Sequence, residues 1–169
     1  QGYIGSLLAP YLAARGHDVT GFDTGFYQDG WLYTDTKDRS AFPKLVWGDI
    51  RKITEADLAG FDAVVHLAEL SNDPLAKRDP GLTFRINHEG SVALAEMAKA
   101  AGVERFVYTS SCSVYGVGNG QMLSEDSTPH PQTAYAECKV LVERDVMKLA
   151  GPGFSPTFLR NATAYGASP

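Results

Sequence analysis

The sequence predicts a doubly wound α/β fold, in which helices cover both faces of a parallel sheet. Short apolar runs typical of strands alternate along the chain with longer segments whose apolar residues recur at helical spacing. The run 62–68 (DAVVHLA) is almost continuously apolar, as expected for a parallel strand buried on both faces. Strands that alternate with helices are joined by right-handed crossovers, and these crossovers make the strands parallel.

The expected elements follow from this alternation. Glycine marks helix ends, because Gly16 and Gly102 each follow a segment of helical spacing. Residues 24–42 show no clear periodicity and are predicted to form a loop with at most a short helix. No repeat or linker interrupts the pattern, so one continuous domain is expected. Helices are predicted over residues 5–14, 54–58, 82–101 and 133–149, and strands over 18–23, 44–47, 62–68, 105–110 and 156–160.

The composition is that of a water-soluble globular protein. Of the 169 residues, 44% are hydrophobic and 21% are charged, and the formal net charge of −5 argues against a nucleic-acid-binding protein. No apolar run is long enough to span a membrane and no signal peptide is recognisable, so a cytoplasmic protein without a membrane partner is expected. Cys112 and Cys138 lack metal-ligand spacing and are interpreted as reduced thiols, so no metal site is expected.

The first candidate site is Gly2-Tyr3-Ile4-Gly5, which opens the first predicted helix. Glycine lets the backbone approach a pyrophosphate, and free N–H groups at the helix start bind the anion. Asp23 follows Gly5 by 18 residues at a strand end, where its carboxylate can accept hydrogen bonds from both hydroxyls of an adenosine ribose and would repel a 2′-phosphate. Either feature alone is common in structural turns. Together they predict a dinucleotide site that takes NAD rather than NADP.

The second candidate site is the pair Tyr135 and Lys139 on the predicted helix 133–149. The i, i+4 spacing places the phenol and the ammonium close together on one helix face. A nearby cation lowers the pKa of tyrosine from about 10 toward the working pH, so the phenol can exchange a proton with a substrate hydroxyl while hydride moves to or from a cofactor. An isolated Tyr-x-x-x-Lys is more often an ordinary surface pair, so this interpretation depends on the rest of the sequence.

The third candidate site is the polar segment 109–116 (TSSCSVYG), at the carboxyl end of a predicted buried strand. Ligands of open α/β sheets bind at the carboxyl ends of the strands. If strand alternation persists this far, Ser111 and Ser113 face one side and Cys112 faces the other. The alternative is a polar strand end whose hydroxyls bond only their own backbone.

These motifs occur in a fixed order, with Ser111 24 residues before Tyr135. With the segments GYIG, GFD, GDI, VVHLA, INHEGSVALAEMAKAAGVERFVYTSSCSVYG, AYAECK and FLRNATAYG, the sequence resembles the extended short-chain dehydrogenase/reductase family, in its nucleotide-sugar epimerase and dehydratase branch. The resemblance covers the whole chain. It implies a Rossmann-like NAD-binding domain over residues 1–169. Both ends interrupt expected structure, so the first strand of the sheet and a C-terminal substrate domain are expected to be missing.

The resemblance also implies roles for individual residues. Tyr135 resembles the catalytic acid and base, and Lys139 the partner that lowers its pKa and binds the nicotinamide ribose. Ser111 resembles the hydroxyl that binds the reacting substrate oxygen, and Asn87 the asparagine that supports the active site. The remaining assignments are adenine contacts at Asp49 and Ile50, cofactor contacts at Leu67, Ala68, Glu69, Thr109 and Tyr135, and substrate contacts at Ser113 and Thr163.

Several positions depart from the family pattern. Only the last two of three motif glycines are present, as Gly2 and Gly5. Cys112 and Ser113 stand where 4,6-dehydratases carry an acidic residue, which argues against that reaction, and Cys112 is one residue away from the cysteine position of 3,5-epimerases. Cys112 is therefore expected to face away and pack. Two further departures are Thr163, where many relatives have asparagine, and Glu69, at a position that is often small.

An epimerase is the expected activity. NAD would stay bound, oxidise the C4 hydroxyl of a nucleotide sugar and return hydride to the opposite face. The alternatives are a dehydrogenase or reductase that releases its reduced cofactor, and a catalytically silent NAD-binding module. The silent module is disfavoured because Ser111, Tyr135 and Lys139 are all present. The expected partners are a small-molecule substrate and a second copy of the chain in a homodimer.

Overall fold

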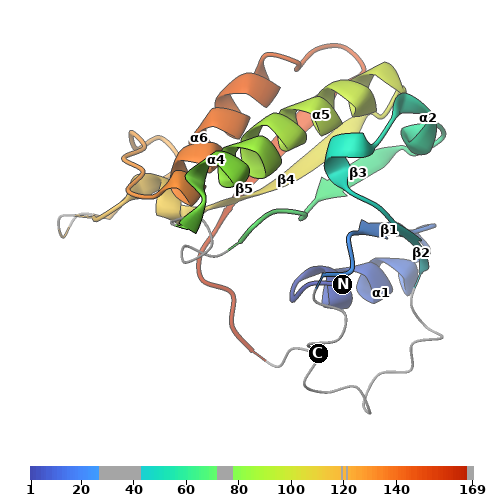
Figure 1. Ribbon diagram of the computed structural model, residues 1–169, viewed down its shortest axis with the longest axis horizontal. Helices are drawn as coiled ribbons and strands as arrows, with labels where there is room; N and C mark the ends of the chain where they lie inside the picture. The colour runs from blue at the N-terminus through green and yellow to red at the C-terminus, as the bar shows by residue number, and fades with distance from the viewer. Residues whose placement is uncertain (27–42, 72–77, 119, 121, 167–169) are drawn as a thin grey trace. The chain divides into compact units, whose positions relative to one another are not determined.

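The computed structural model describes residues 1–26, 43–71, 78–118, 120 and 122–166 (Figure 1). The chain divides into two compact units, one made of residues 1–49 with the stretch from Tyr165 onward, and the other of residues 50–164. Most of the loop predicted over residues 24–42 lies outside the described residues. All pairs between named strands are parallel, which confirms the predicted α/β class.

The first unit contains one helix and two strands. Helix α1 (Gly5–Ala13) begins where the glycine motif predicts, and Gly16 follows it in the left-handed region at a φ of 88°. Strands β1 (Thr20–Asp23) and β2 (Lys44–Trp47) form a two-stranded parallel sheet. Asp23 therefore closes a strand, as predicted.

The second unit is built on a three-stranded parallel sheet in the order β3-β4-β5. Its strands are β3 (Ala63–His66), β4 (Arg105–Ser111) and β5 (Ser155–Asn161). Its helical segments are a 3-10 turn (Ile50–Lys52), α2 (Glu55–Leu58), α4 (Pro80–Thr83), a π-helical segment (Phe84–Gly90), α5 (Ser91–Ala100), a second 3-10 turn (Cys112–Tyr115) and α6 (Ala134–Met147).

The long helix predicted over residues 82–101 begins earlier and is not uniformly α-helical. It starts at α4, where the Asp79 carboxylate accepts a hydrogen bond from the Leu82 N–H at 2.8 Å. It then passes through the π-helical segment into α5 and ends before Gly102, as predicted. Hydrophobic spacing does not mark such a wide turn, and π-turns are frequent at functional sites.

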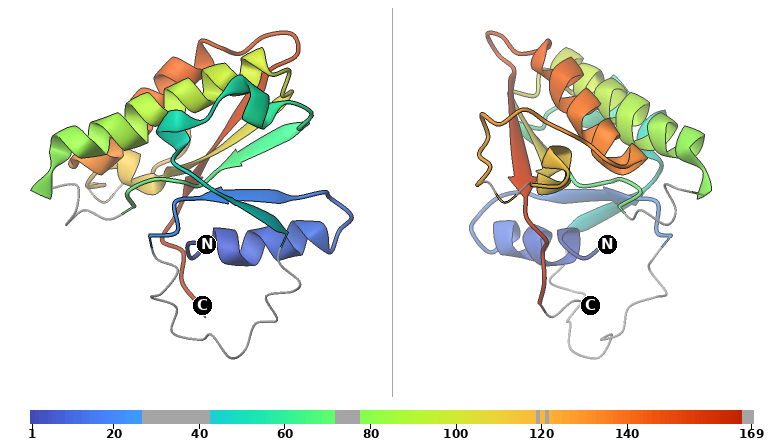
Figure 2. Two further views of the ribbon diagram at one scale, coloured as in Figure 1. Left: turned by 45° about the vertical axis from the view of Figure 1, so that its right-hand side comes forward. Right: turned by 90° about the vertical axis from the view of Figure 1, so that its left-hand side faces the viewer.

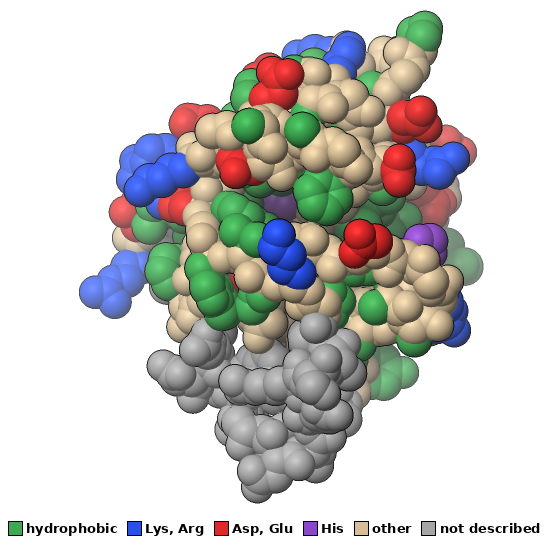
Figure 3. Space-filling view, turned by 90° about the vertical axis from the view of Figure 1, so that its right-hand side faces the viewer, with side chains coloured by type: hydrophobic (Ala, Val, Ile, Leu, Met, Phe, Trp, Pro, Cys, Tyr) green, Lys and Arg blue, Asp and Glu red, His purple; other side chains and the backbone are tan. Residues whose placement is uncertain are grey.

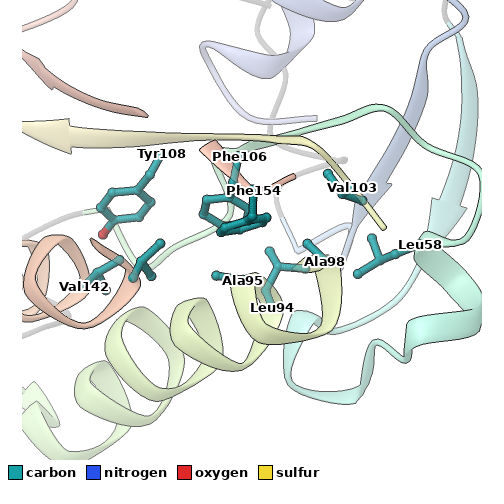
Figure 4. Packing of buried hydrophobic residues seen from close by; sticks show 10 residues of the cluster. Leu58, Leu94, Ala95, Ala98, Val103, Phe106, Tyr108, Val142 and Phe154 are labelled. Atoms are coloured by element: carbon teal, nitrogen blue, oxygen red, sulfur yellow. The ribbon is translucent and has the colours of Figure 1, made fainter. Parts of the chain in front are cut away.

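The core of the second unit lies between the sheet and the pair α5 and α6, which lie side by side on one face (Figures 1 and 2). Alternate residues of β4 are buried toward these helices, among them Phe106 and Tyr108 (Figure 4). The apolar members of the core cluster are Leu58, Leu94, Ala95, Ala98, Val103, Phe106, Tyr108, Val142, Val146 and Phe154.

Strand β3 is less buried than its apolar sequence predicts. Val65 is 39% exposed and Ala63 is exposed, whereas His66 is buried and its Nε2 lies 2.7 Å from the Ser91 Oγ. Among the described strands β3 pairs only with β4, and the two long helices of this unit lie on the same face of the sheet. The prediction that this strand is buried on both faces is therefore wrong for the unit in which it lies.

Two predictions, that the chain does not bind nucleic acid and that it does not span a membrane, concern the charges of its surface and the length and polarity of its helices. Acidic and basic side chains are interspersed on the face shown in Figure 3. Within the part of the chain that the structure describes, no helix is both long enough and apolar enough to cross a lipid bilayer. Both cysteines are free thiols, as predicted.

Candidate active site

Tyr135 and Lys139 lie in the first part of helix α6, as predicted. The helix begins at Ala134 because the Thr133 hydroxyl accepts a hydrogen bond from the Ala136 N–H at 3.2 Å. The Lys139 Nζ lies 5.2 Å from the centroid of the Tyr135 ring. The spacing of the two residues therefore brings the phenol and the ammonium together on one face of the helix.

The Lys139 side chain is buried, with only 3% of it exposed. Its ammonium donates a hydrogen bond to the backbone oxygen of Thr109, two residues before Ser111 in β4. This bond ties the active face of α6 to the carboxyl end of β4. The predicted catalytic residues of the helix and the strand thus belong to one structural unit.

A second partner of Lys139 is the carboxylate of Glu69, which forms an ion pair with the ammonium. The other Glu69 oxygen accepts a hydrogen bond from the Tyr108 hydroxyl at 2.5 Å. Burial, with the Glu69 charge acting in the same sense, raises the pKa of Tyr108, so this phenol remains a donor. The sequence places Glu69 among the cofactor contacts, whereas its side chain is engaged by Lys139 and Tyr108.

Asn87 is fully buried in the π-helical segment. Its amide nitrogen donates to the backbone oxygen of Leu70 at 2.9 Å, and its amide oxygen accepts from the Leu70 N–H at 2.9 Å. These two bonds fix the loop that follows β3. Asn87 therefore acts here on the position of that loop, which carries Leu67, Ala68 and Glu69.

Ser111 is the last residue of β4, and the 3-10 turn Cys112–Tyr115 begins directly after it. Its Oγ accepts a hydrogen bond from the Ser113 N–H at 3.1 Å, at the start of the 3-10 turn. Strand alternation therefore stops at Ser111. Cys112 is exposed, so the expectation that it packs is wrong. The Ser113 Oγ is buried and has no hydrogen-bond partner among the described residues, which suits contact with a polar ligand.

Gly116 makes the turn after Ser111 possible. It has a φ of 66°, and a Cβ on it would lie 2.2 Å from the backbone oxygen of His130. The His130 N–H in turn donates to the Val114 oxygen at 2.8 Å. The segment around residue 130 thus packs directly on the 3-10 turn and holds it at the end of β4.

A cavity of about 380 Å³ lies beside this turn, with Cys112, Tyr115, Glu125 and Arg160 in its lining. The Arg160 guanidinium forms an ion pair with Glu143 at 2.7 Å and donates to the Tyr115 hydroxyl at 2.8 Å. Sequence reasoning missed this network, because its members are 17 and 45 residues apart. Thr163, predicted to contact substrate, is exposed beyond the end of β5.

The glycine turn and Asp23 lie close together in the first unit. The backbone nitrogen of Gln1 lies 3.1 Å from one oxygen of the Asp23 carboxylate, and the other oxygen accepts from the Gly25 N–H at 2.7 Å. The start of the glycine turn therefore adjoins the end of β1, and its role in binding a dinucleotide stays a prediction. A Cβ on Gly2 would meet no atom of the described residues within 4 Å.

The other residues predicted to contact the cofactor differ in how far their side chains are exposed. Ile50 is 8% exposed, and its Cδ1 lies 3.4 Å from the position of a Cβ on Gly90, so its side chain packs on the π-helical segment. Only its backbone is left to contact an adenine. Leu67 and Ala68 follow β3 directly and are half-buried. Asp49 is the last residue of the stretch 1–49, which belongs to the first unit. The roles of these residues stay predictions.

The chain is similar to known enzymes over its whole length. The sequence model of the NAD-dependent epimerase/dehydratase family matches residues 1–169. A UDP-glucose 4-epimerase of Corynebacterium glutamicum is 30% identical over 172 aligned residues, which cover 98% of this chain and 50% of that protein. The chain thus spans about half the length of the curated relatives it matches.

Solved structures of similar enzymes have the same fold. A UDP-glucose 4-epimerase of Stenotrophomonas maltophila, with NAD and formylated UDP-arabinopyranose, gives a TM-score of 0.79 at 29% identity and covers 94% of this chain and 49% of that one. The NAD-dependent NDP-hexosamine 5,6-dehydratase TunA gives 0.80 at 27% identity and covers 94% and 51%. The chain therefore belongs to the NAD-dependent epimerase/dehydratase family.

Proposed function

We propose that the chain is the NAD-binding portion of an epimerase that acts on a nucleotide-activated sugar. The observation that carries this proposal is the buried Lys139, whose ammonium adjoins Tyr135 and is tied to the strand end that bears Ser111. This arrangement suits proton exchange with a substrate hydroxyl. The similarity to UDP-glucose 4-epimerases supports the choice of reaction and substrate class.

The residues of both units suit a dinucleotide cofactor. In the first unit, the turn at Gly2 and the start of α1 suit a pyrophosphate, and Asp23 suits the hydroxyls of the adenosine ribose. In the second unit, the ammonium of Lys139 suits the hydroxyls of the nicotinamide ribose. When bound, NAD supplies a hydride acceptor that can return the hydride to the substrate.

The residues of the second unit would move and hold protons. Tyr135 would take the proton from the substrate hydroxyl as hydride leaves the adjacent carbon, and would give it back after the hydride returns. Lys139 would stabilise the phenolate form of Tyr135 by its charge. The Ser111 hydroxyl would donate a hydrogen bond to the reacting oxygen and keep it within reach of the phenol.

The test of this function is to incubate the full chain encoded by the gene with NAD and UDP-glucose. We expect the 4-epimer to form without accumulation of NADH, because the hydride returns to the sugar. Nuclear magnetic resonance follows the sugar and absorbance follows NADH. NADH formed in proportion to oxidised sugar would instead identify a net dehydrogenase, and neither change with any nucleotide sugar would contradict the proposal.

Asp23 is expected to make the protein prefer NAD over NADP. Its carboxylate would repel a 2′-phosphate and accept hydrogen bonds from free ribose hydroxyls. Replacing it with alanine should weaken NAD binding and narrow the preference, as measured by calorimetric titration with each cofactor. Asp18→Ala, which changes an aspartate just before the same strand, is the matched control. Equal or tighter binding of NADP by the unchanged protein would contradict the role of Asp23.

A further inference from the structure

Glu69 and Lys139 form a buried ion pair in the second unit. The Glu69 side chain is 4% exposed and that of Lys139 is 3% exposed. The carboxylate bonds the ammonium through one oxygen and the Tyr108 hydroxyl through the other. The ammonium also donates to the Thr109 backbone oxygen. Two partners thus hold Lys139 in place before any ligand binds.

The fold holds Glu69 at this position from a second side. The neighbouring residue, Leu70, is bound at both its N–H and its carbonyl by the amide of Asn87, at 2.9 Å each. Asn87 projects from the π-helical segment and is fully buried. A buried amide with both ends satisfied resists displacement, because leaving either polar group buried and unpaired is unfavourable. The position of Glu69 is therefore built into the fold.

The ion pair lies within reach of Tyr135. The Lys139 ammonium is 5.2 Å from the centroid of the Tyr135 ring and 4.6 Å from that of Tyr108. A negative charge next to this ammonium opposes its effect on Tyr135 and hinders loss of a proton from the Tyr135–Lys139 pair. The titratable groups that act on this cluster from β3, the following loop, β4 and α6 are His66, Glu69, Tyr108, Glu137 and Cys138.

The charges of these neighbours favour Glu69 as the deciding group. Burial lowers the pKa of His66 to about 3, so this imidazole is neutral. Burial raises the pKa of Cys138 to about 12 and also raises that of Tyr108, so both are neutral as well. Burial raises the pKa of Glu69 too, but the Lys139 ammonium acts in the opposite sense. Glu137 is exposed, and solvent screens its charge.

We propose that Glu69 is a positioning residue that fixes the Lys139 ammonium and sets the pH at which the Tyr135–Lys139 pair gives up its proton. This inference deepens the proposed function, since that proton transfer is the acid–base step of the epimerase. A neutral side chain at position 69 would leave the ammonium's charge unopposed.

The test is the replacement Glu69→Gln in the full chain. Glutamine removes the charge and keeps one oxygen that can accept from Lys139, while its amide nitrogen can donate to the Tyr108 hydroxyl oxygen in place of the bond that Tyr108 donates to Glu69. We expect the midpoint of the rise of kcat with pH to move down by about one pH unit. The ultraviolet absorbance of phenolate, taken as the difference between each protein and its Tyr135→Phe counterpart, should move down equally. A midpoint that is unchanged or higher would overturn the proposal.

Two further variants keep the test decisive. Glu137→Gln removes a charge from the exposed side of the same helix and should leave both midpoints in place. Tyr108→Phe keeps the ion pair but removes the 2.5 Å hydrogen bond to Glu69, a bond that lowers the pKa of this carboxyl. The variant therefore shifts Glu69 toward its neutral form, and both midpoints should move down, as in Glu69→Gln. If Glu69→Gln does not fold, a fall in Tyr108→Phe supports the proposal, and no fall contradicts it. The phenolate titration needs no substrate, so it decides the role of Glu69 even if the proposed epimerase activity fails.

Discussion

Tyr135→Phe is expected to lower kcat by about 10²- to 10⁴-fold, the range typical of general acid–base catalysis. Phenylalanine keeps the ring beside Lys139 and removes the hydroxyl that would exchange the proton. The dissociation constant for NAD should change little, because the phenol acts on the substrate. Steady-state kinetics of the full chain and calorimetric titration with NAD measure the two quantities separately.

Tyr115→Phe is the matched control for this prediction. It also removes a phenol, one that accepts a hydrogen bond from Arg160 at 2.8 Å and lies at the end of the 3-10 turn Cys112–Tyr115. Loss of the Tyr115 hydroxyl should lower the melting temperature and leave kcat nearly unchanged. Thermal unfolding measures the first quantity and steady-state kinetics the second. A Tyr135→Phe protein that keeps most of its kcat would reject Tyr135 as the acid and base.

Lys139→Met is expected to abolish most turnover and to destabilise the protein by about 3 kcal/mol at neutral pH. Methionine retains the length of the stem but leaves the Glu69 carboxylate buried without its cation. NAD binding should also weaken, because the same ammonium would bind the nicotinamide ribose. Chemical denaturation, kinetics and calorimetry of the full chain measure these three effects.

The loss of stability in Lys139→Met should depend on pH. Burial raises the pKa of Glu69 above the value of about 4.3 that a glutamate has in the unfolded chain, and without Lys139 it rises further. A group with a raised pKa in the folded state contributes its full stability below the unfolded pKa, and this contribution is lost as pH rises through the folded pKa. The free energy of unfolding of Lys139→Met should therefore fall further below that of the unchanged protein as the pH rises from mildly acidic to neutral.

The double variant Lys139→Met with Glu69→Gln tests whether the buried Glu69 carboxylate causes this pH-dependent loss of stability. Without a carboxylate to bury, it should be more stable than Lys139→Met at neutral pH, and the added pH dependence should disappear. A Lys139→Met protein as stable as the unchanged protein at neutral pH would show that the ion pair contributes nothing. An unchanged pH dependence in the double variant would assign the effect to another group.

The sequence predicted the elements whose signals are local. The extents of α1, β2 and α6 agree closely with hydrophobic spacing and with the cap residues Thr133 and Gly16. The meeting of Tyr135 and Lys139 could be foreseen because the helix repeat alone sets it. The π-helical segment at Asn87 and the 3-10 turn directly after Ser111 could not be foreseen, because hydrogen bonds to Leu70 and Ser113 determine them.

The sequence by itself therefore determined the α/β class, the NAD-dependent family and the local pairing of the catalytic phenol and ammonium. Only the tertiary structure decided what surrounds that pair. Glu69 and Tyr108 are 39 residues apart, and Lys139 is 30 residues from Thr109, so no spacing rule relates them. They meet because the sheet and α6 are packed together and exclude water, and a buried charge in such a place needs a partner.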